Sequence, residues 1–148
     1  MKYRVTTLNE IDKLVELRKK QLIDEGSSPN EDITEELHKF FEKKMNDGTM
    51  IEWVVEEGNE IIATSAIVFY EFPPSFTNKS GIKGYVTNMY TAPEYRGRGI
   101  ASSLLDKLIN EAKARNIHKL WLGASEMGRP VYLKYGFVEK NIWLDLHI

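Results

Sequence analysis

A strand that passes through a glycine-rich basic turn into a helix constrains the fold of this chain more than any other feature. The segment 82–91 is typical of a strand, and from Gly99 onward apolar residues recur at helical spacing on one continuous face. Between the two lies Arg-Gly-Arg-Gly (96–99). The apolar face of the helix, which we expect to end near Asn116, needs a second layer to pack against. The chain therefore requires a sheet with a helix across its face.

The other elements follow from the same two periods of apolar residues. We expect strands at 2–7, 51–57, 60–72, 82–91, 119–124 and 141–148, and helices from Asn9 to Gly26, Thr34 to Gly48, Gly99 to Asn116 and over 129–135. The last strand is predicted from the alternation of Ile142, Leu144, Leu146 and Ile148, and Trp53, Trp121 and Trp143 each fall in a predicted strand. This order predicts an α/β (α+β) fold with a mixed central sheet flanked by helices.

Composition limits the function classes. With 148 residues, 42% of them hydrophobic, the chain suits a single domain over residues 1–148. Its formal net charge of −2 gives no sign of nucleic-acid binding, so any anion site must arise locally. The absence of cysteine excludes disulfides and thiolate catalysis, and no segment approaches the roughly 20 apolar residues that span a bilayer. We expect a soluble, cytoplasmic protein that does not act on a membrane.

The basic turn has the features of an anion site. The first turn of a helix leaves about four backbone N–H groups unpaired and carries roughly half a positive charge. Gly97 and Gly99 have no Cβ, so a phosphate can approach the backbone, and Arg96 and Arg98 add attraction. We expect a phosphate or pyrophosphate to bind here. The alternative is that the glycines only turn the chain and the arginines are solvated.

The turn matches one known phosphate motif and not two others. The G-x-x-x-x-G-K-[ST] loop is absent, and the dinucleotide motif G-x-G-x-x-G would need glycine at Ser102. Residues 96–101 match R-x-x-G-x-[GA], and here the sequence resembles the GNAT family of acetyl-CoA-dependent N-acetyltransferases. The resemblance implies a GNAT-like acyl-CoA N-acyltransferase fold with a mostly antiparallel sheet. It also implies acetyl-CoA as co-substrate.

The same resemblance implies a set of cofactor-binding residues. In that family the turn holds the pyrophosphate of coenzyme A, and the residues before it hold the pantetheine arm like an added strand. The matching positions are Met89, Tyr90 and Thr91 for the arm, and Arg96, Gly97, Arg98, Gly99, Ile100 and Ala101 for the pyrophosphate. Backbone groups do most of this work. The N–H of Tyr90 is the implied donor to the oxyanion of the tetrahedral intermediate.

A second motif lies about 30 residues downstream. The segment 125–137 resembles the family pattern N-x-x-A-x-x-x-Y-x-x-x-G-F, with Ser125 in place of Asn and Gly128 in place of Ala. The match implies that Tyr132 is the general acid that protonates the departing thiolate, and that Ser125 takes over part of the contact between the Asn position and the cofactor arm. For Tyr132 the alternative is a packing role in an aromatic-rich helix.

The general base is not assigned by the sequence. No Asp, Glu or His lies between Ile82 and Pro93, where some members of the family carry a strand carboxylate. Glu71 and Glu126 are the nearest acids by layout, and a water chain or a partly deprotonated amine would serve equally well. His38, His118 and His147 do not have the spacing of metal ligands, so we predict no metal.

Together these features predict an N-acetyltransferase that moves an acetyl group from acetyl-CoA to a primary amine by direct attack on the thioester. The acceptor, a small-molecule amine or a peptide N-terminus, stays open. The acidic cluster Glu31, Asp32, Glu35 and Glu36 either attracts a cationic amine or is a solvated helix start. The alternatives are an acetyl-CoA-binding sensor or degenerate member without transfer activity, and an unrelated phosphate binder. Members of the family are frequently dimers, and the sequence leaves open whether this chain forms a homodimer.

Overall fold

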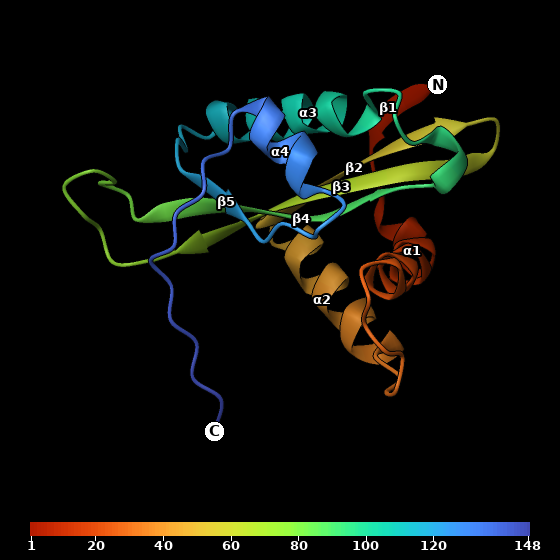
Figure 1. Cartoon of the computed structure of the whole chain (residues 1–148), viewed down its shortest axis with the longest axis horizontal. Coiled ribbons are helices and arrows are strands. Elements are labelled where there is room, and N and C mark those ends of the chain that lie inside the picture. The colour runs from red at the N-terminus through yellow and green to blue at the C-terminus, as the bar shows by residue number, and fades with distance from the viewer.

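A five-stranded sheet in the order β1-β2-β3-β4-β5 carries helices on both faces in the computed structural model, which describes residues 1–148 (Figure 1). The elements are β1 (Lys2–Val5), α1 (Ile11–Asp24), α2 (Thr34–Asn46), β2 (Met50–Glu57), β3 (Glu60–Glu71), β4 (Ile82–Thr91), α3 (Ile100–Ala114), β5 (Leu120–Leu122) and α4 (Arg129–Tyr135), with short 3-10 turns η1 (Leu8–Glu10) and η2 (Pro93–Tyr95). Strands β1 to β4 are antiparallel and β5 pairs in parallel with β4. The expected mixed, mostly antiparallel sheet is confirmed.

The two faces of the sheet bury separate apolar clusters. Helices α1 and α2 cover one face, where Leu14 and Phe41 pack with Val54 and Val68. Helices α3 and α4 cover the other face, on which the α3 residues Leu105 and Leu108 belong to one cluster with strand residues. Strand β3 is buried over eight consecutive residues because it is central and covered on both sides.

The pairing of β4 differs on its two edges. Along β3 it pairs from Ile82 to Thr91, with a register shift opposite residues 64–66. Asn88, which lies in this irregular stretch, has a left-handed φ of 55°. Along β5 it pairs only over Gly84–Val86, because β5 is three residues long. The second half of β4 therefore has one edge without a strand beside it.

The prediction of a last strand at 141–148 is wrong for this chain. These residues form no strand, and the tail runs away from the domain (Figure 1). Ile142 is 72% exposed and Leu144 is 99% exposed. The alternation is present, but a strand needs a neighbouring strand for its hydrogen bonds, and none of this chain's strands lies beside it. Trp143 is consequently not a strand residue, whereas Trp53 and Trp121 are.

The remaining element boundaries agree with expectation to within a few residues. The first strand ends at Val5 instead of Thr7, and Asn9 lies inside η1 instead of capping α1. No helix is long and apolar enough to cross a membrane.

Candidate active site

The turn before α3 presents a row of free backbone donors. Gly97 and Gly99 have φ values of 77° and 78°, in the left-handed region that glycine adopts without strain. The amides of residues 97–102 have no hydrogen-bond acceptor within the protein, and α3 has no side-chain cap and no acid in its first turn. A Cβ built on either glycine would meet no atom within 4 Å, so the space in front of the amides is open. The turn can therefore take an anion on its backbone.

The two arginines of this turn are held by the protein itself. Arg96 donates to the carbonyl of Thr91 at 2.8 Å and to Asp24, at the end of α1, at 3.2 Å. Arg98 donates to the carbonyl of Glu94 at 3.0 Å and lies over the ring of Tyr95. The guanidinium groups thus fix the shape of the turn, and their charge adds to the attraction of the helix end.

The free edge of β4 leads directly into this turn. Met89, Tyr90 and Thr91 lie beyond the three residues that pair with β5, so one side of their backbone has no strand beside it. Their other side pairs with β3, where Thr91 lies opposite Ala63. An extended ligand segment can add to such an edge as another strand would. The structure thus brings the predicted arm-binding and pyrophosphate-binding residues into one continuous path.

Tyr132 is buried beside this path. It lies on α4, is 9% exposed, and packs in the same apolar cluster as Met89. Burial, reinforced by the negative charge of Glu25, raises the pKa of its phenol to about 12. The hydroxyl has no hydrogen-bond partner in the protein. A protonated phenol of this kind is free to donate to a ligand atom.

Gly128 and Ser125 show why the second motif departs from its usual residues. A Cβ on Gly128 would lie 2.9 Å from the Tyr132 ring and 3.1 Å from the Ser125 hydroxyl oxygen, which leaves no room for alanine. That hydroxyl accepts a hydrogen bond from the Gly128 N–H at 3.0 Å, so Ser125 secures the start of α4. Its predicted contact with the cofactor arm stays a prediction.

A buried polar group lies on the opposite face of the sheet, under α1, and the sequence analysis missed it. Glu52 of β2 is 2% exposed, and its carboxylate atom Oε2 has no hydrogen-bond partner. Its strand neighbour is Ala66, whose small side chain leaves space for Glu52 to reach over β3 toward Asn88 of β4. The sequence does contain a sign of this group: the acid at position 52 alternates along the strand with Met50 and Val54, which both point inward and are buried.

The charge state of Glu52 follows from its surroundings. Burial raises the pKa of the Glu52 carboxyl to about 8, although a hydrogen bond from Asn88 and the positive charge of Arg18 act in the opposite direction. Arg18 is itself partly buried on α1, and the carboxamide oxygen of the neighbouring Gln21 also has no partner. Two buried side-chain oxygen atoms on this side of the sheet, one of Glu52 and one of Gln21, thus have no hydrogen-bond partner within the protein.

The acids that the sequence analysis considered as general bases lie elsewhere. Glu71 is exposed and pairs across from Ile82, at the opposite end of β4 from Tyr90. At about 3.3 Å per residue, the seven strand positions from Thr64 to Glu71 separate it from the bulge by about 23 Å. Glu126 is exposed in the segment before α4. Neither acid shares the buried setting of Glu52.

Aromatic side chains gather at the far end of β4. The ring of Trp121 on β5 lies 4.9 Å from that of Tyr85, 6.3 Å from that of Tyr70 and 5.7 Å from that of Phe72, measured between centroids. Tyr70 and Tyr85 belong to the face that α1 and α2 cover, because Tyr85 pairs with Val68 of that face's apolar cluster and Tyr70 packs against the same cluster. Tyr70 and Tyr85 thus share a face of the sheet with the buried Glu52, which lies on the same face as Met50 and Val54.

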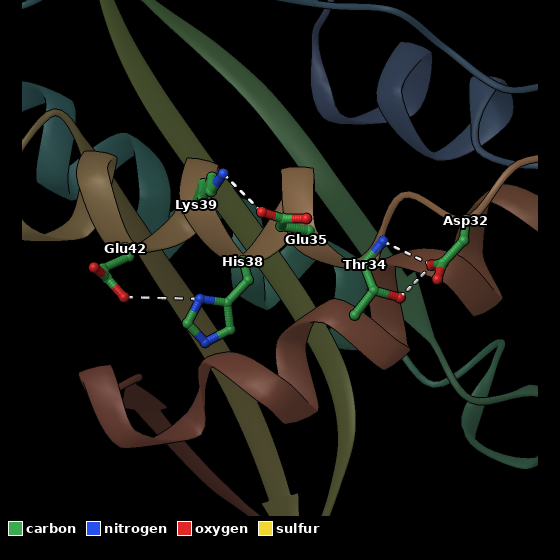
Figure 2. A pocket seen from close by; sticks show the side chains of 6 residues that line it. All are labelled: Asp32, Thr34, Glu35, His38, Lys39 and Glu42. Carbon is green, nitrogen blue, oxygen red and sulfur yellow. Dashed lines mark hydrogen bonds and ion pairs between the residues drawn. The ribbon is translucent and has the colours of Figure 1, made fainter.

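A surface hollow along α2 is unrelated to these features. It has a volume of about 620 Å³ and lies along α2, lined by Asp32, Thr34, Glu35, His38, Lys39 and Glu42 (Figure 2). Asp32 accepts hydrogen bonds from the N–H and hydroxyl of Thr34, which lower the pKa of its carboxyl, and Glu35 pairs with Lys39 at 2.8 Å. Asp32, just before α2, and Glu35 in its first turn are thus paired with residues of α2, which favours the solvated helix start. Nowhere in residues 1–148 do three or more His, Cys, Asp or Glu side chains come together to hold a metal ion.

Comparison with known proteins identifies relatives of the chain. The sequence pattern described as the Acetyltransferase (GNAT) family matches residues 11–137. A predicted acetyltransferase from Clostridium acetobutylicum, solved with acetyl-CoA, is 55% identical, with a TM-score of 0.97 over 99% of this chain and 95% of that chain. Glucosamine 6-phosphate N-acetyltransferase of Trypanosoma brucei brucei is 32% identical over 75 residues, and the uncharacterized N-acetyltransferase YedL of Escherichia coli K12 is 26% identical over 119 residues. The match to the trypanosomal enzyme covers 49% of this chain and 51% of that protein. The match to YedL covers 77% of this chain and 69% of that protein.

The raised pKa of Glu52 predicts a stability difference that depends on pH. The folded protein retains a proton on Glu52 that the unfolded chain releases above its ordinary pKa of 4.5, so the free energy of unfolding falls as the pH rises from there to about 8. The loss reaches about 1.4 kcal/mol per pH unit inside that window. Glu52→Gln removes the titration, and we expect the variant to gain stability over the wild type steadily from about pH 5 to about pH 8.

Guanidinium unfolding at several pH values measures this difference. The matched control is Glu71→Gln, which neutralises an exposed acid and should follow the wild-type curve. If Glu52→Gln and the wild type lose stability in parallel across the range, Glu52 does not hold the proton.

Proposed function

The chain belongs to the GNAT family of acetyltransferases, and from this premise we propose that it transfers the acetyl group of acetyl-CoA to a primary amine. The observation that carries the proposal is the continuous path from the free edge of β4 to the open amides at the start of α3, with the Tyr132 phenol beside it. The acetyl-CoA in the Clostridium acetobutylicum structure supports the same cofactor.

The cofactor is bound mainly by backbone in this proposal. The pyrophosphate of acetyl-CoA rests on the amides of residues 97–102, and the pantetheine arm lies along Met89–Thr91 as an added strand. The thioester carbonyl then lies at the N–H of Tyr90, which stabilises the oxyanion that forms during the reaction. Holding both reactants in one groove removes much of the entropic barrier.

Residues of this chain take part in two of the proton movements that the chemistry requires. The neutral amine nitrogen attacks the thioester carbon, and its now positively charged nitrogen releases a proton to solvent water. The tetrahedral intermediate then collapses as the carbon–sulfur bond breaks. The sulfur leaves as a thiolate and takes the proton of the Tyr132 hydroxyl. Burial keeps this phenol protonated at neutral pH, and the same dry surroundings make the thiolate a stronger base, which favours the transfer.

We assign the second proton movement to Glu52. An acceptor amine reaches the enzyme as an ammonium ion and must lose a proton before it attacks. The Glu52 carboxylate, directed toward Asn88 and so toward the bulge that precedes Met89, is placed to take that proton. A carboxyl whose pKa lies near the working pH suits this role. The unpartnered oxygen atoms of Glu52 and Gln21 would accept the N–H groups of the acceptor.

The alternative is a domain that binds acetyl-CoA without transferring the acetyl group. Release of coenzyme A thiol with a panel of small amines and peptides tests the proposal, because a sensor would bind the cofactor and release no thiol with any acceptor. Acetyl-CoA protection against thermal unfolding, measured in parallel, separates loss of transfer from loss of binding.

Cofactor binding predicts a specific order of mutational effects. We expect Gly99→Val to weaken acetyl-CoA binding at least about tenfold, because its φ of 78° is strained for valine and the side chain blocks the amides. Arg98→Ala should cost less, since its guanidinium is already held by Glu94 and Tyr95. Isothermal calorimetry measures both affinities.

The control for backbone strain is Gly58→Val in the turn between β2 and β3. Gly58 has a φ of 64° and equally open surroundings, but it lies outside the proposed site. It should leave the affinity unchanged, and an Arg98→Ala effect larger than that of Gly99→Val would overturn the backbone mode of binding.

The acid role of Tyr132 predicts a loss of turnover without loss of binding. Tyr132→Phe keeps the edge-to-face packing on Phe137 and removes only the hydroxyl. We expect kcat to fall by about two orders of magnitude while the acetyl-CoA Kd changes by less than about twofold. The matched control is Tyr135→Phe, which removes a hydroxyl from the same helix, α4, that donates to Asp106 of α3, and this variant should retain activity. Equal turnover in both variants would leave Tyr132 a packing residue.

The base role of Glu52 predicts an altered pH profile. Wild-type kcat/KM should rise with pH up to about 8 as the Glu52 carboxyl ionises, and Glu52→Gln should lose this rise and about tenfold or more in rate at that pH. Glu71→Gln should reproduce the wild-type profile. An unchanged profile in Glu52→Gln would assign the proton to water or to the acceptor itself.

A further inference from the structure

The side of α1 that faces the sheet changes character halfway along the helix. Residues 11, 14, 18 and 21 recur at helical spacing and so share one side of α1. Ile11 and Leu14 are apolar and belong to the buried core. Further along, the same side carries Arg18 and the buried Gln21, where packing against the sheet would favour apolar residues. The polar half of this side therefore needs an explanation beyond folding.

Arg18 is a partly buried cation without an acceptor. No hydrogen bond or ion pair joins its guanidinium to another residue of the protein. Burial lowers the pKa of this group, and the negative charge of Glu25 offsets the effect only in part. A guanidinium carries five N–H donors in a fixed fork that matches the two oxygen atoms of a carboxylate. These unpaired donors are the counterpart of the unpaired oxygen atoms of Glu52 and Gln21.

The polar side of α1 lies beside the proposed reaction site. The negative charge of Glu25, which caps α1, acts both on Arg18 and on the Tyr132 hydroxyl, although these two groups come from opposite faces of the sheet. The same end of the helix is tied to the turn before α3, because Asp24 pairs with Arg96 at 3.2 Å. Arg18 therefore lies near the end of the path along which we place the cofactor.

Arg18 and Glu52 are near each other without being in contact. Beside the dominant effect of burial, each charge acts on the pKa of the other group, yet the two form no ion pair. A ligand between them binds to both when it has an N–H donor at one end and an anion at the other. Opposite charges act on a pKa chiefly within about 4–6 Å. The donor and the anion of such a ligand therefore lie only a few bonds apart.

The charges around Arg18 favour an anion that carries a single charge. The groups whose charges act on Arg18 are Glu25, Tyr85 and Glu52, and no cation is among them. Arg18 is also the cation that acts on Glu52. One guanidinium balances a carboxylate, whereas a phosphate dianion would keep an excess of negative charge beside these acids.

Aromatic side chains give the same face an apolar surface. Thr87 is in register with Glu52 across β3, and Tyr85 lies two residues before it on β4. At about 3.3 Å per residue, Tyr85 is about 7 Å along the strand from the row of Glu52. Tyr85 pairs in register with Trp121 of β5, and the centroids of their rings lie 4.9 Å apart. An apolar side chain of the same ligand therefore has a surface within reach.

We propose that Arg18 binds a carboxylate on the acceptor, and that the acceptor is an α-amino acid with an apolar side chain. This inference rests on the proposed acetyl transfer and narrows its acceptor. The amine lies at Glu52 and Gln21, and the carboxylate receives two N–H groups of Arg18. The side chain lies toward Tyr85 and Trp121. The carboxylate itself is not altered: the nitrogen–carbon bond forms, the carbon–sulfur bond breaks, and the products are the N-acetyl amino acid, coenzyme A and one proton.

Transfer to three related amines tests the role of the carboxylate. They are phenylalanine, phenylalanine amide and 2-phenylethylamine, which lacks the carboxyl group. We expect kcat/KM to be at least about tenfold higher with phenylalanine than with either other amine. Arg18→Gln should remove this preference, mainly by raising the KM for phenylalanine. Lys20→Gln removes a positive charge from the exposed side of the same helix, so it is the matched control and should keep the preference. The ratio of two acceptors within one variant cancels any general loss of activity.

Several results would overturn the inference while leaving the proposed transfer intact. These are equal rates with all three amines, a preference for phenylalanine that survives in Arg18→Gln, faster transfer to glutamate or lysine than to phenylalanine, and faster transfer to O-phosphoethanolamine than to any amino acid. Each would mean that Arg18 does not select a carboxylate or that the aromatic surface does not receive the side chain.

Calorimetry of phenylalanine binding to the protein with coenzyme A decides the inference without turnover. If no amine releases thiol, the proposed transfer fails, and binding is then the only measure of recognition. A Kd at least about tenfold weaker in Arg18→Gln than in Lys20→Gln would support the carboxylate contact. Absence of phenylalanine binding to the wild type, or equal binding to both variants, would overturn it.

Discussion

The short pairing between β4 and β5 is the constraint on which the site depends. Parallel hydrogen bonds join the two strands only over Gly84–Val86, and beyond that point β4 continues with β3 as its only strand neighbour. A longer β5 would satisfy the edge at Met89–Thr91 and close the path that leads to the start of α3. The unpaired groups are exposed because that edge lies at the surface, where water or an extended ligand can bond to them.

In the proposed reaction the two faces of β4 serve the cofactor and the acceptor separately. On the face of α3 and α4, Met89 and Tyr132 share an apolar cluster, and this environment keeps the phenol protonated. On the face of α1 and α2, the bulge at Asn88 adjoins the buried Glu52. The proposed proton donor and the proposed proton acceptor thus lie on opposite faces of the sheet. Burial raises the pKa of both groups because it disfavours their charged forms. The two values still differ, about 8 for Glu52 and about 12 for Tyr132, because the ordinary pKa of glutamate lies well below that of tyrosine.

The sequence predicted the parts of the structure that depend on neighbours along the chain. The glycines at 97 and 99, the helix that follows and the position of Tyr132 all follow from local pattern, and the structure brings these residues together. The buried setting of Glu52 was not predicted, because its partner Asn88 lies 36 residues away in the sequence and on the far side of β3. The strand at 141–148 failed for a related reason, since alternation specifies the shape of a strand but not the sheet that accepts it.

Glu52 is difficult to explain as a structural residue. A buried acceptor without a donor costs about 1–3 kcal/mol relative to a satisfied one, and Arg18 compensates only in part because burial also lowers the pKa of its own guanidinium. Valine or isoleucine would fill the same inward position between Met50 and Val54 without that cost, and the fold already places such residues at the adjacent positions of the face. Groups that cost stability persist where a ligand uses them, and the nearest ligand path is the edge of β4, one residue beyond Asn88. The arrangement is therefore better explained by an amine that brings its own N–H donors to Glu52 than by any role in holding the sheet together.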